Sequence, residues 1–181
     1  DSMRITPLNA IDVHRLCAVE MADLDIPRSA LIGSGGRGAA AWEEVLPAIT
    51  ALKCAEMVGG MQQVLDMTVA YAASRHQFGR PIGSFQAIQH ACADMATLVE
   101  AGRLAAYQAI TLLHDGIHAP AQVHIAKAWC SDAYKQVTWK AHQIHGGIGF
   151  TAELPLHRFY IHAKACELFM GDSHRHRDFL A

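Results

Sequence analysis

The chain has 181 residues, a formal net charge of −2 at pH 7 and an apolar content of 51%. This length can bury one proper core with a short appendage. The small net charge gives no reason to expect nucleic acid or an anionic membrane as a partner. No apolar run reaches the roughly 18 residues that suggest a membrane span, and residues 1–10 do not resemble a signal peptide.

The cysteines are odd in number, evenly scattered and without a CxxC pair; they are Cys17, Cys54, Cys92, Cys130 and Cys166. This pattern argues against a disulfide framework or a zinc site. Small buried thiols in a reducing cytoplasm fit it best. The sequence also begins without methionine and without an opening helix, which suggests a fragment of a longer chain.

The first residues read as strands. Residues 3–8 and 16–21 show a short, loose apolar alternation, and residues 23–27 end in a turn signal. Two such strands cannot bury a sheet by themselves. We therefore predict that residues 1–34 are the last strands of a β-domain with a linker, and that residues 35–181 form a separate helical domain.

The run GSGGRG at residues 33–38 formally matches the dinucleotide-binding pattern GxGxxG. That motif requires a buried strand before it and a second parallel strand after its helix. Helical sequence follows here and no second parallel strand appears. The linker interpretation is therefore favoured.

A first long helix is predicted from Ala39 to Ser74, with Pro47 near its start, where a first turn or a kink can absorb it. Its apolar residues recur every three or four positions, as on one buried face. These positions are Val45, Leu46, Ile49, Leu52, Met57, Met61, Val64, Leu65 and Thr68.

Three further helices follow, separated by glycine-containing breaks. Ser84 is a plausible N-cap for a helix that ends near residue 114, and Pro120 opens the next, over residues 120–145. The last covers about 155–171. The predicted fold is mainly α: an up-down four-helix bundle preceded by the last strands of a β-domain.

Three stretches carry a resemblance to a known family. Residues 73–89 read ASRHQFGRPIGSFQAIQ, residues 143–155 read QIHGGIGFTAELP, and residues 158–164 read RFYIHAK. In order and spacing they resemble the C-terminal helical domain of acyl-CoA dehydrogenases, and Ile32-Gly33 is similar to the exit of that family's middle β-domain. The resemblance covers essentially the whole chain.

The resemblance implies a cofactor and a site. In this family FAD lies at a subunit interface, so each subunit lends residues to its neighbour's flavin. The residues implied to bind the cofactor here are Arg75, Gln77, Phe78, Phe85, Gln86, Gln143, Gly146 and Gly147. An arginine suits pyrophosphate because the guanidinium donates paired hydrogen bonds, and glycines let backbone amides approach closely.

The sequence departs from the family at the catalytic loop. The family's run is close to YEGTSEIQ, whereas residues 169–176 read FMGDSHRH. Aligned in this way, Met170 stands at the position of the glutamate that removes the substrate's α-proton. A thioether cannot act as a general base. The alternative position for a base, on the first long helix, falls at about Ile49, so the resemblance implies no catalytic residue in this chain.

The half of the interface that would hold the chain's own FAD also differs. Asp172 replaces a threonine that the family uses against its own flavin, and His174 follows two residues later. A carboxylate near flavin phosphates is repulsive unless it is countered. The residues that reach towards a neighbour's flavin, in contrast, are all present.

These features favour a non-catalytic subunit of a hetero-oligomeric acyl-CoA dehydrogenase, similar to the α2β2 complexes of actinobacterial steroid catabolism. Its partner would be a catalytic acyl-CoA dehydrogenase subunit with an acyl-CoA substrate, and its location cytoplasmic. Two alternatives remain: a self-sufficient dehydrogenase with a displaced base (Asp172, Glu167 or a tail histidine), or a flavin-free helical scaffold.

Histidines at the C-terminal end raise the question of a metal. His174 and His176, with His157 and His162 before them, form no recognisable ligand set, and arginines lie between the tail histidines. We therefore predict no metal site. Three tryptophans at helical spacing, Trp42, Trp129 and Trp139, are expected to be core or interface anchors.

Overall fold

The computed structural model describes residues 2–10, 16–33 and 35–181, which divide into two compact units, 1–46 and 47–181. In the first unit, β1 (Met3–Pro7) pairs antiparallel with β2 (Cys17–Met21), so that Ile5 lies opposite Val19. Both side chains remain about half exposed. Two five-residue strands do not bury a core, as the sequence predicts.

The linker that follows contains a short 3-10 turn, η1 (Arg28–Ala30). The run at residues 33–38 leads directly into the helix α1 (Gly38–Ser74). Among the described residues no parallel strand accompanies it, as the linker interpretation expects. Ser34 lies outside the described residues. Pro47 is inside α1 and is the first residue of the second compact unit.

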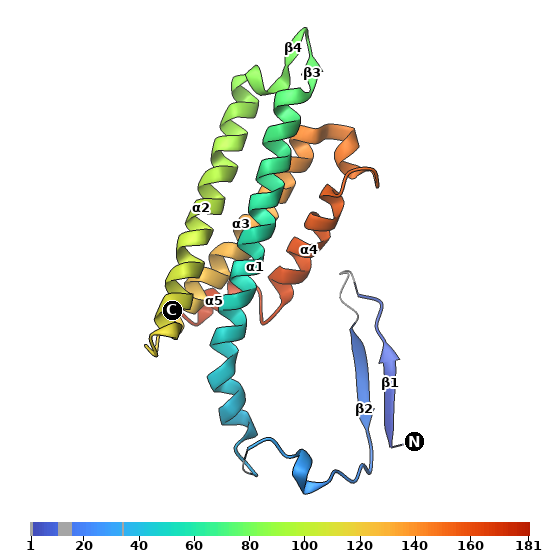
Figure 1. Ribbon diagram of the computed structural model, residues 1–181, viewed down its shortest axis with the longest axis vertical. Helices are drawn as coiled ribbons and strands as arrows, with labels where there is room; N and C mark the ends of the chain where they lie inside the picture. Colours follow the sequence, from blue (N-terminus) through green and yellow to red (C-terminus); the bar gives the residue numbers. More distant parts are fainter. Residues whose placement is uncertain (1, 11–15, 34) are drawn as a thin grey trace. The chain divides into compact units, whose positions relative to one another are not determined.

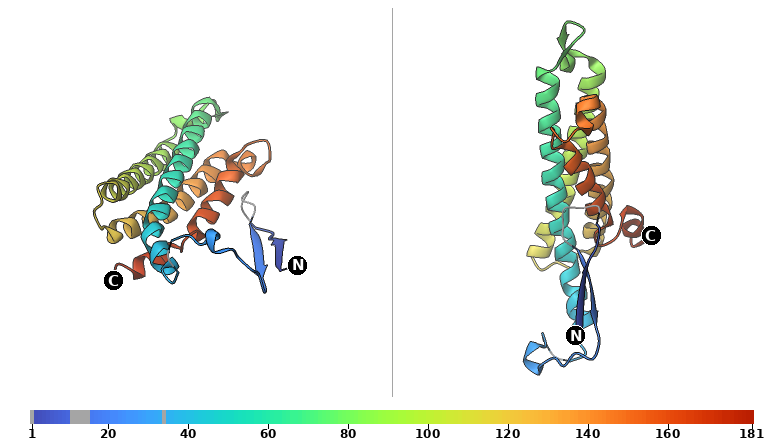
Figure 2. Two further views of the ribbon diagram at one scale, coloured as in Figure 1. Left: turned by 60° about the horizontal axis from the view of Figure 1, so that its bottom comes forward. Right: turned by 90° about the vertical axis from the view of Figure 1, so that its right-hand side faces the viewer.

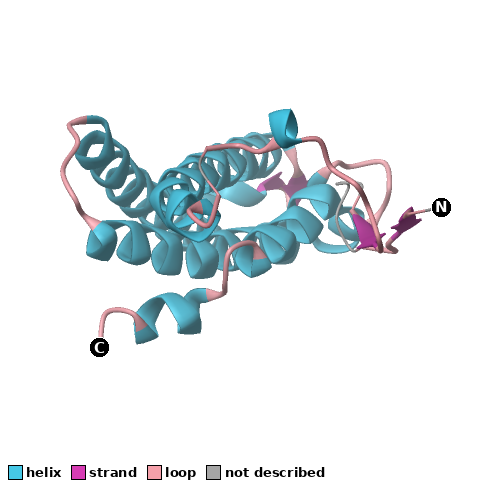
Figure 3. Cartoon of the chain, turned by 90° about the horizontal axis from the view of Figure 1, so that it is seen from below, coloured by secondary structure: helices cyan, strands magenta, loops and turns pink. Residues whose placement is uncertain are grey.

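The second unit is a helical bundle, as predicted (Figure 1). α1 is followed by α2 (Gln86–His114), α3 (Pro120–His145) and α4 (Leu156–Leu168), and α5 (Ser173–Asp178) packs beside α3 (Figure 3). A short hairpin of β3 (His76–Gln77) and β4 (Arg80–Pro81), with the 3-10 turn η2 (Ile82–Ser84), joins α1 to α2. A second 3-10 turn, η3 (Gly146–Phe150), joins α3 to α4.

Two details of the sequence interpretation are wrong. The N-cap of α2 is Phe85, not Ser84, whose hydroxyl donates to the Pro81 carbonyl 2.7 Å away inside the preceding turn. In α1, Leu52 and Val45 are exposed at 65% and 50%, although the apolar spacing includes them in the buried face. Small residues, among them Ala51 and Cys54, lie in the core instead.

The core runs along the interior of the bundle between α1, α2, α3 and α4 (Figure 2). Its fully buried large side chains are Met57, Met61, Val64, Met95, Val99, Tyr134, Val137 and Leu156. Many of the remaining core positions are alanine or cysteine, which lets the helices approach closely. Trp42, Trp129 and Trp139 are 51%, 42% and 63% exposed, which excludes a core role within this chain.

Candidate functional site

The β3–β4 hairpin holds an aromatic side chain out into solvent. Its two turn residues, Phe78 and Gly79, have positive φ angles of 53° and 77°. Two consecutive residues of positive φ form the tight turn that matches the twist of a hairpin, although phenylalanine is unusual in that conformation. The Phe78 side chain is 91% exposed as a result.

A groove of about 390 Å³ lies beside this hairpin. The Phe78 and Phe85 rings meet edge-on at 6.1 Å between centroids, and the Arg80 guanidinium lies 4.0 Å from the Phe85 ring centre. The lining residues are Gln77, Phe78, Ile82, Phe85, Ala87, Ile88 and Ile144. Three residues predicted to contact a cofactor therefore share one groove, to which the end of α3 also contributes.

The end of α3 lies at the same end of the bundle as the hairpin (Figure 1). The Tyr71 ring stacks on His145 at 4.4 Å between centroids, which ties the two helices together. Gly146 ends α3 with a φ of 64°, a conformation that favours glycine. All eight predicted cofactor residues thus gather at this end, and seven of them are exposed, Phe85 being half-buried.

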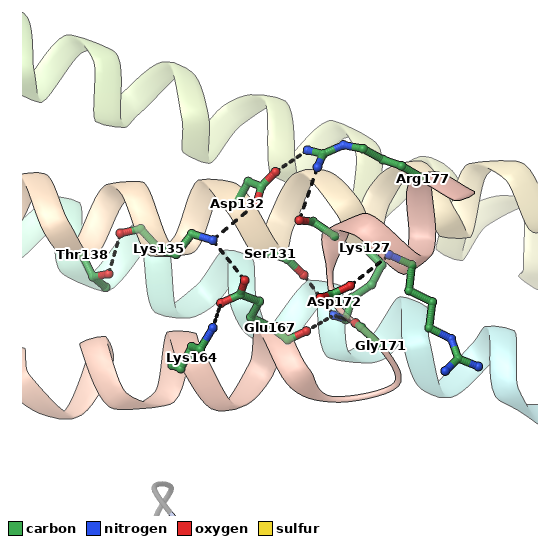
Figure 4. Close-up of polar contacts among 12 residues, drawn as sticks. Lys127, Ser131, Asp132, Lys135, Thr138, Lys164, Glu167, Gly171, Asp172 and Arg177 are labelled. Atoms are coloured by element: carbon green, nitrogen blue, oxygen red, sulfur yellow. Dashed lines mark hydrogen bonds and ion pairs between the residues drawn. The ribbon is translucent and has the colours of Figure 1, made fainter. Parts of the chain in front are cut away.

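The opposite end of α3 contains a fully buried lysine, Lys127 (Figure 4). Its ammonium donates to the carbonyls of Glu167, at 3.1 Å, and Gly171, at 2.8 Å, and to the Ser131 hydroxyl, at 3.0 Å. The carbonyls belong to the C-terminal end of α4 and the turn after it, where backbone acceptors lack helical partners. Burial lowers the pKa of Lys127, and nearby thiols and Glu167 partly oppose this shift.

The turn after α4 contains Met170, which the sequence motif aligns with the family's glutamate. Met170 has a φ of 59° and Gly171 a φ of 104°. The His176 Nε2 lies 3.1 Å from the Met170 carbonyl, and its Nδ1 lies 2.8 Å from Nδ1 of His124. Burial lowers the pKa of His176 to about 4. Contacts from α3 and α5 thus hold the backbone of this turn on both sides of Met170.

The two acids considered as displaced bases, Asp172 and Glu167, have structural partners. The Asp172 carboxylate caps α5 by accepting a hydrogen bond from the Arg175 amide at 2.9 Å, and that bond lowers its pKa. Glu167 accepts from Lys135 at 3.0 Å and Lys164 at 2.8 Å. Burial alone would raise the pKa of Glu167, but these hydrogen bonds outweigh it and lower the pKa.

Comparisons with known proteins agree with this architecture. Residues 36–181 match the family described as "Acyl-CoA dehydrogenase, C-terminal domain". The chain belongs to the acyl-CoA dehydrogenase family. A probable short/branched chain specific acyl-CoA dehydrogenase of Dictyostelium discoideum is 33% identical over 157 residues, which are 87% of this chain and 38% of that protein.

Two further relatives are informative. The caffeyl-CoA reductase-Etf complex subunit CarC of Acetobacterium woodii is 32% identical over 84% of this chain and 40% of its own length. A solved structure of PigA with FAD and proline has a TM-score of 0.93 at 27% identity, covering 99% of this chain and 48% of the PigA chain. The chain thus spans about two fifths of the length of these curated relatives.

The PigA structure was solved with FAD, the cofactor that the resemblance implies for this chain. The hairpin end has suitable chemistry for the cofactor: an exposed guanidinium for phosphate oxygens and exposed aromatic rings for a heterocycle. Among the described residues, no carboxylate pairs with Arg75. A side chain at Gly147 would meet no atom of this chain within 4 Å, which leaves space for a group from outside.

Sequence reasoning missed Lys127, although a signal was present. Lys127 falls between the buried Val123 and Cys130 at helical spacing, so the apolar face of α3 passes through a lysine. A charged residue in such a face indicates a buried ion with dedicated partners.

Within the described residues, no helix is long and apolar enough to cross a membrane.

Proposed function

We propose that this acyl-CoA dehydrogenase chain is part of a non-catalytic subunit that completes the FAD site of a catalytic partner. In the assembly, bound FAD would supply the hydride acceptor for an acyl-CoA thioester, and a carboxylate of the partner would take the α-proton. Arg75, Gln77 and Gln86 would hold the pyrophosphate and adenosine part of the partner's cofactor. Phe78 and Phe85 would stack beside it, and Gln143, Gly146 and Gly147 would close the same site.

The observation that carries this proposal is the contrast around Met170. The residue at the position of the base is a thioether, and the nearby acids are engaged: Asp172 caps a helix and Glu167 holds two lysines. His176 is buried and its pKa is about 4, too low for a base near neutral pH. Seven of the eight residues that would serve another subunit's flavin, in contrast, are exposed.

The finer parts of the proposal concern the assembly. An α2β2 hetero-oligomer in the cytoplasm, acting on a steroid side-chain CoA thioester, would accommodate one chain without a base. A relative that is itself named as a subunit of a complex, CarC, makes a multi-subunit setting reasonable. Trp129 and Trp139 are exposed and would be buried at such interfaces.

The test is to purify the native protein with and without its partner and to measure flavin per chain and acyl-CoA oxidation. One FAD per two chains, with activity only in the complex, supports the proposal. Stoichiometric FAD and turnover by this protein alone would overturn it. A colourless complex would instead favour the flavin-free scaffold.

The displaced-base alternative has its own test within the same experiment. Asp172→Asn keeps a side-chain oxygen that caps α5 but removes the carboxylate as a base. Under our proposal the complex retains its turnover. Loss of turnover with unchanged flavin content would assign the base to Asp172 and contradict the proposed role.

A further inference from the structure

A cluster of three potential metal ligands lies between α1 and α4, apart from the hairpin, and its cysteine precedes Met170 by four residues. It consists of Glu56, His162 and Cys166, and one donor atom from each lies within 4.8 Å of the other two. The His162 Nε2 is 2.9 Å from Glu56 Oε1 and 3.4 Å from the Cys166 sulfur. We propose that this cluster binds a borderline-soft divalent cation, Zn²⁺.

The nitrogen, oxygen and sulfur donors suit this ion. Zn²⁺ binds nitrogen and oxygen at about 2.0–2.2 Å and sulfur at about 2.3 Å in tetrahedral geometry, which puts neighbouring ligand atoms roughly 3.3–3.6 Å apart. Rotation of the His162 ring or of the Cys166 side chain must bring Nε2 and the sulfur to one ion, because the sulfur lies 3.4 Å from Nε2 and also 3.8 Å from Nδ1. His162 and Cys166 are four residues apart on α4, so they lie on one face of the helix.

The outer contacts orient two of the ligands. The Tyr134 hydroxyl lies 3.3 Å from Nδ1 of His162, on the side of the ring away from Glu56. The Lys53 ammonium donates to Glu56 Oε2 at 2.6 Å, which leaves Oε1 directed at the histidine. Hydrogen bonds to the far atoms of a ligating histidine and carboxylate are the usual outer shell of a metal site.

Tyr134 occupies its position because α1 has a glycine opposite it. A Cβ at Gly60 would stand 2.2 Å from the Tyr134 hydroxyl oxygen, an impossible contact. The tyrosine is fully buried. The fold thus makes room for the hydroxyl group that orients His162.

Charge and exposure favour one ion with an open position. The Glu56 carboxylate and a Cys166 thiolate together neutralise a divalent cation, and the thiol proton leaves when the metal binds. Cys166 is 2% exposed, whereas the Glu56 side chain is 42% exposed, so the carboxylate faces solvent. Three protein ligands with a solvent-facing side leave the fourth position for water.

The experiment uses the native protein in its full assembly, treated with a chelator and then titrated with Zn²⁺ or Co²⁺. We expect one ion per chain, and with Co²⁺ a thiolate charge-transfer band that Cys166→Ser removes. Tyr134→Phe removes an outer partner and should weaken Zn²⁺ binding by about 10–100-fold. Glu56→Gln and His162→Gln each remove a ligand and should weaken Zn²⁺ binding by more than this.

Cys92→Ser is the matched control, because Cys92 is a half-buried thiol on α2 outside the cluster; it should leave both the affinity and the cobalt spectrum unchanged. Glu56→Gln changes a partly exposed side chain, so an unaltered melting temperature excludes misfolding as its cause of weaker binding. A wild-type protein that binds Zn²⁺ no better than Cys166→Ser, or shows no thiolate band, would overturn the proposal.

Discussion

The β3–β4 hairpin and the Met170 turn both connect helices of the same bundle, but they differ in where their polar and aromatic groups point. At the hairpin, the Phe78 ring is 91% exposed and Arg75 extends from the end of α1 into solvent. At the Met170 turn, Lys127, His176 and Asp172 contact backbone atoms of their own chain.

The Met170 turn and the hairpin therefore have different physical roles. A turn whose acceptors are satisfied by buried donors is fixed by the fold itself and contributes to stability. A turn that exposes a large aromatic ring and a guanidinium contributes little to the stability of its own chain, and its side chains are available to another molecule. Substitutions at the two connections should therefore affect different measurements.

The largest effect is expected at Lys127. Lys127→Met should lower the free energy of unfolding by about 3 kcal/mol or more, because the buried carbonyls of Glu167 and Gly171 lose a charged donor. Urea denaturation measures this change. Lys140→Met is the control, since its pairing with Asp94 is at the surface and is worth about 0–1 kcal/mol. Equal effects of the two substitutions would show that the Met170 turn is not held by Lys127.

At the hairpin we expect a loss of cofactor instead of stability. Arg75→Ala should weaken FAD binding in the assembled complex by about 10–100-fold, which corresponds to about 1.4–2.8 kcal/mol of charge-assisted hydrogen bonding. The free energy of unfolding should change by less than about 0.5 kcal/mol, as for other exposed positions. Flavin fluorescence and denaturation are measured on the same preparation. Unaltered FAD affinity would remove Arg75 from the proposed site.

The histidine pair gives the Met170 turn a pH dependence. Burial lowers the pKa of His176 from 6.5 to about 4, so the unfolded chain binds a proton at a higher pH than the folded chain does. Stability should therefore fall as the pH decreases from about 6.5 to about 4 and level off below. His176→Gln should reduce this slope, measured by thermal melting. The same substitution at the exposed His118 is the control, and equal slopes in both variants would exclude His176 as the cause.

The smallest effect is expected at Phe78. Phe78→Asn should leave the free energy of unfolding within about 0.5 kcal/mol of the wild type, because the ring is exposed and asparagine tolerates positive φ better. FAD content of the complex should nevertheless decrease. A clear decrease in the free energy of unfolding would show that the Phe78 ring contributes to the stability of the fold, and it would contradict the distinction between the hairpin and the Met170 turn.

The sequence predicts the helices well where local signals act. Pro120 begins α3 and glycine ends it at residue 146, as expected, because proline suits a first helical turn and glycine suits the positive φ of a helix end. Ser84 misleads, since its hydroxyl bonds within the η2 turn and the helix starts two residues later. The exposed Leu52 shows that spacing alone does not select the packed face of α1.

The sequence by itself determined the family, the helical fold and the absence of a carboxylate at residue 170, because these depend on residue identity, local spacing and motifs. Only the tertiary structure decided that Lys127 is buried under the Met170 turn and that Glu56 meets His162, 106 residues away. Such contacts arise where helices pack, and the side chains that meet there depend on interhelical geometry, which no single stretch of sequence encodes.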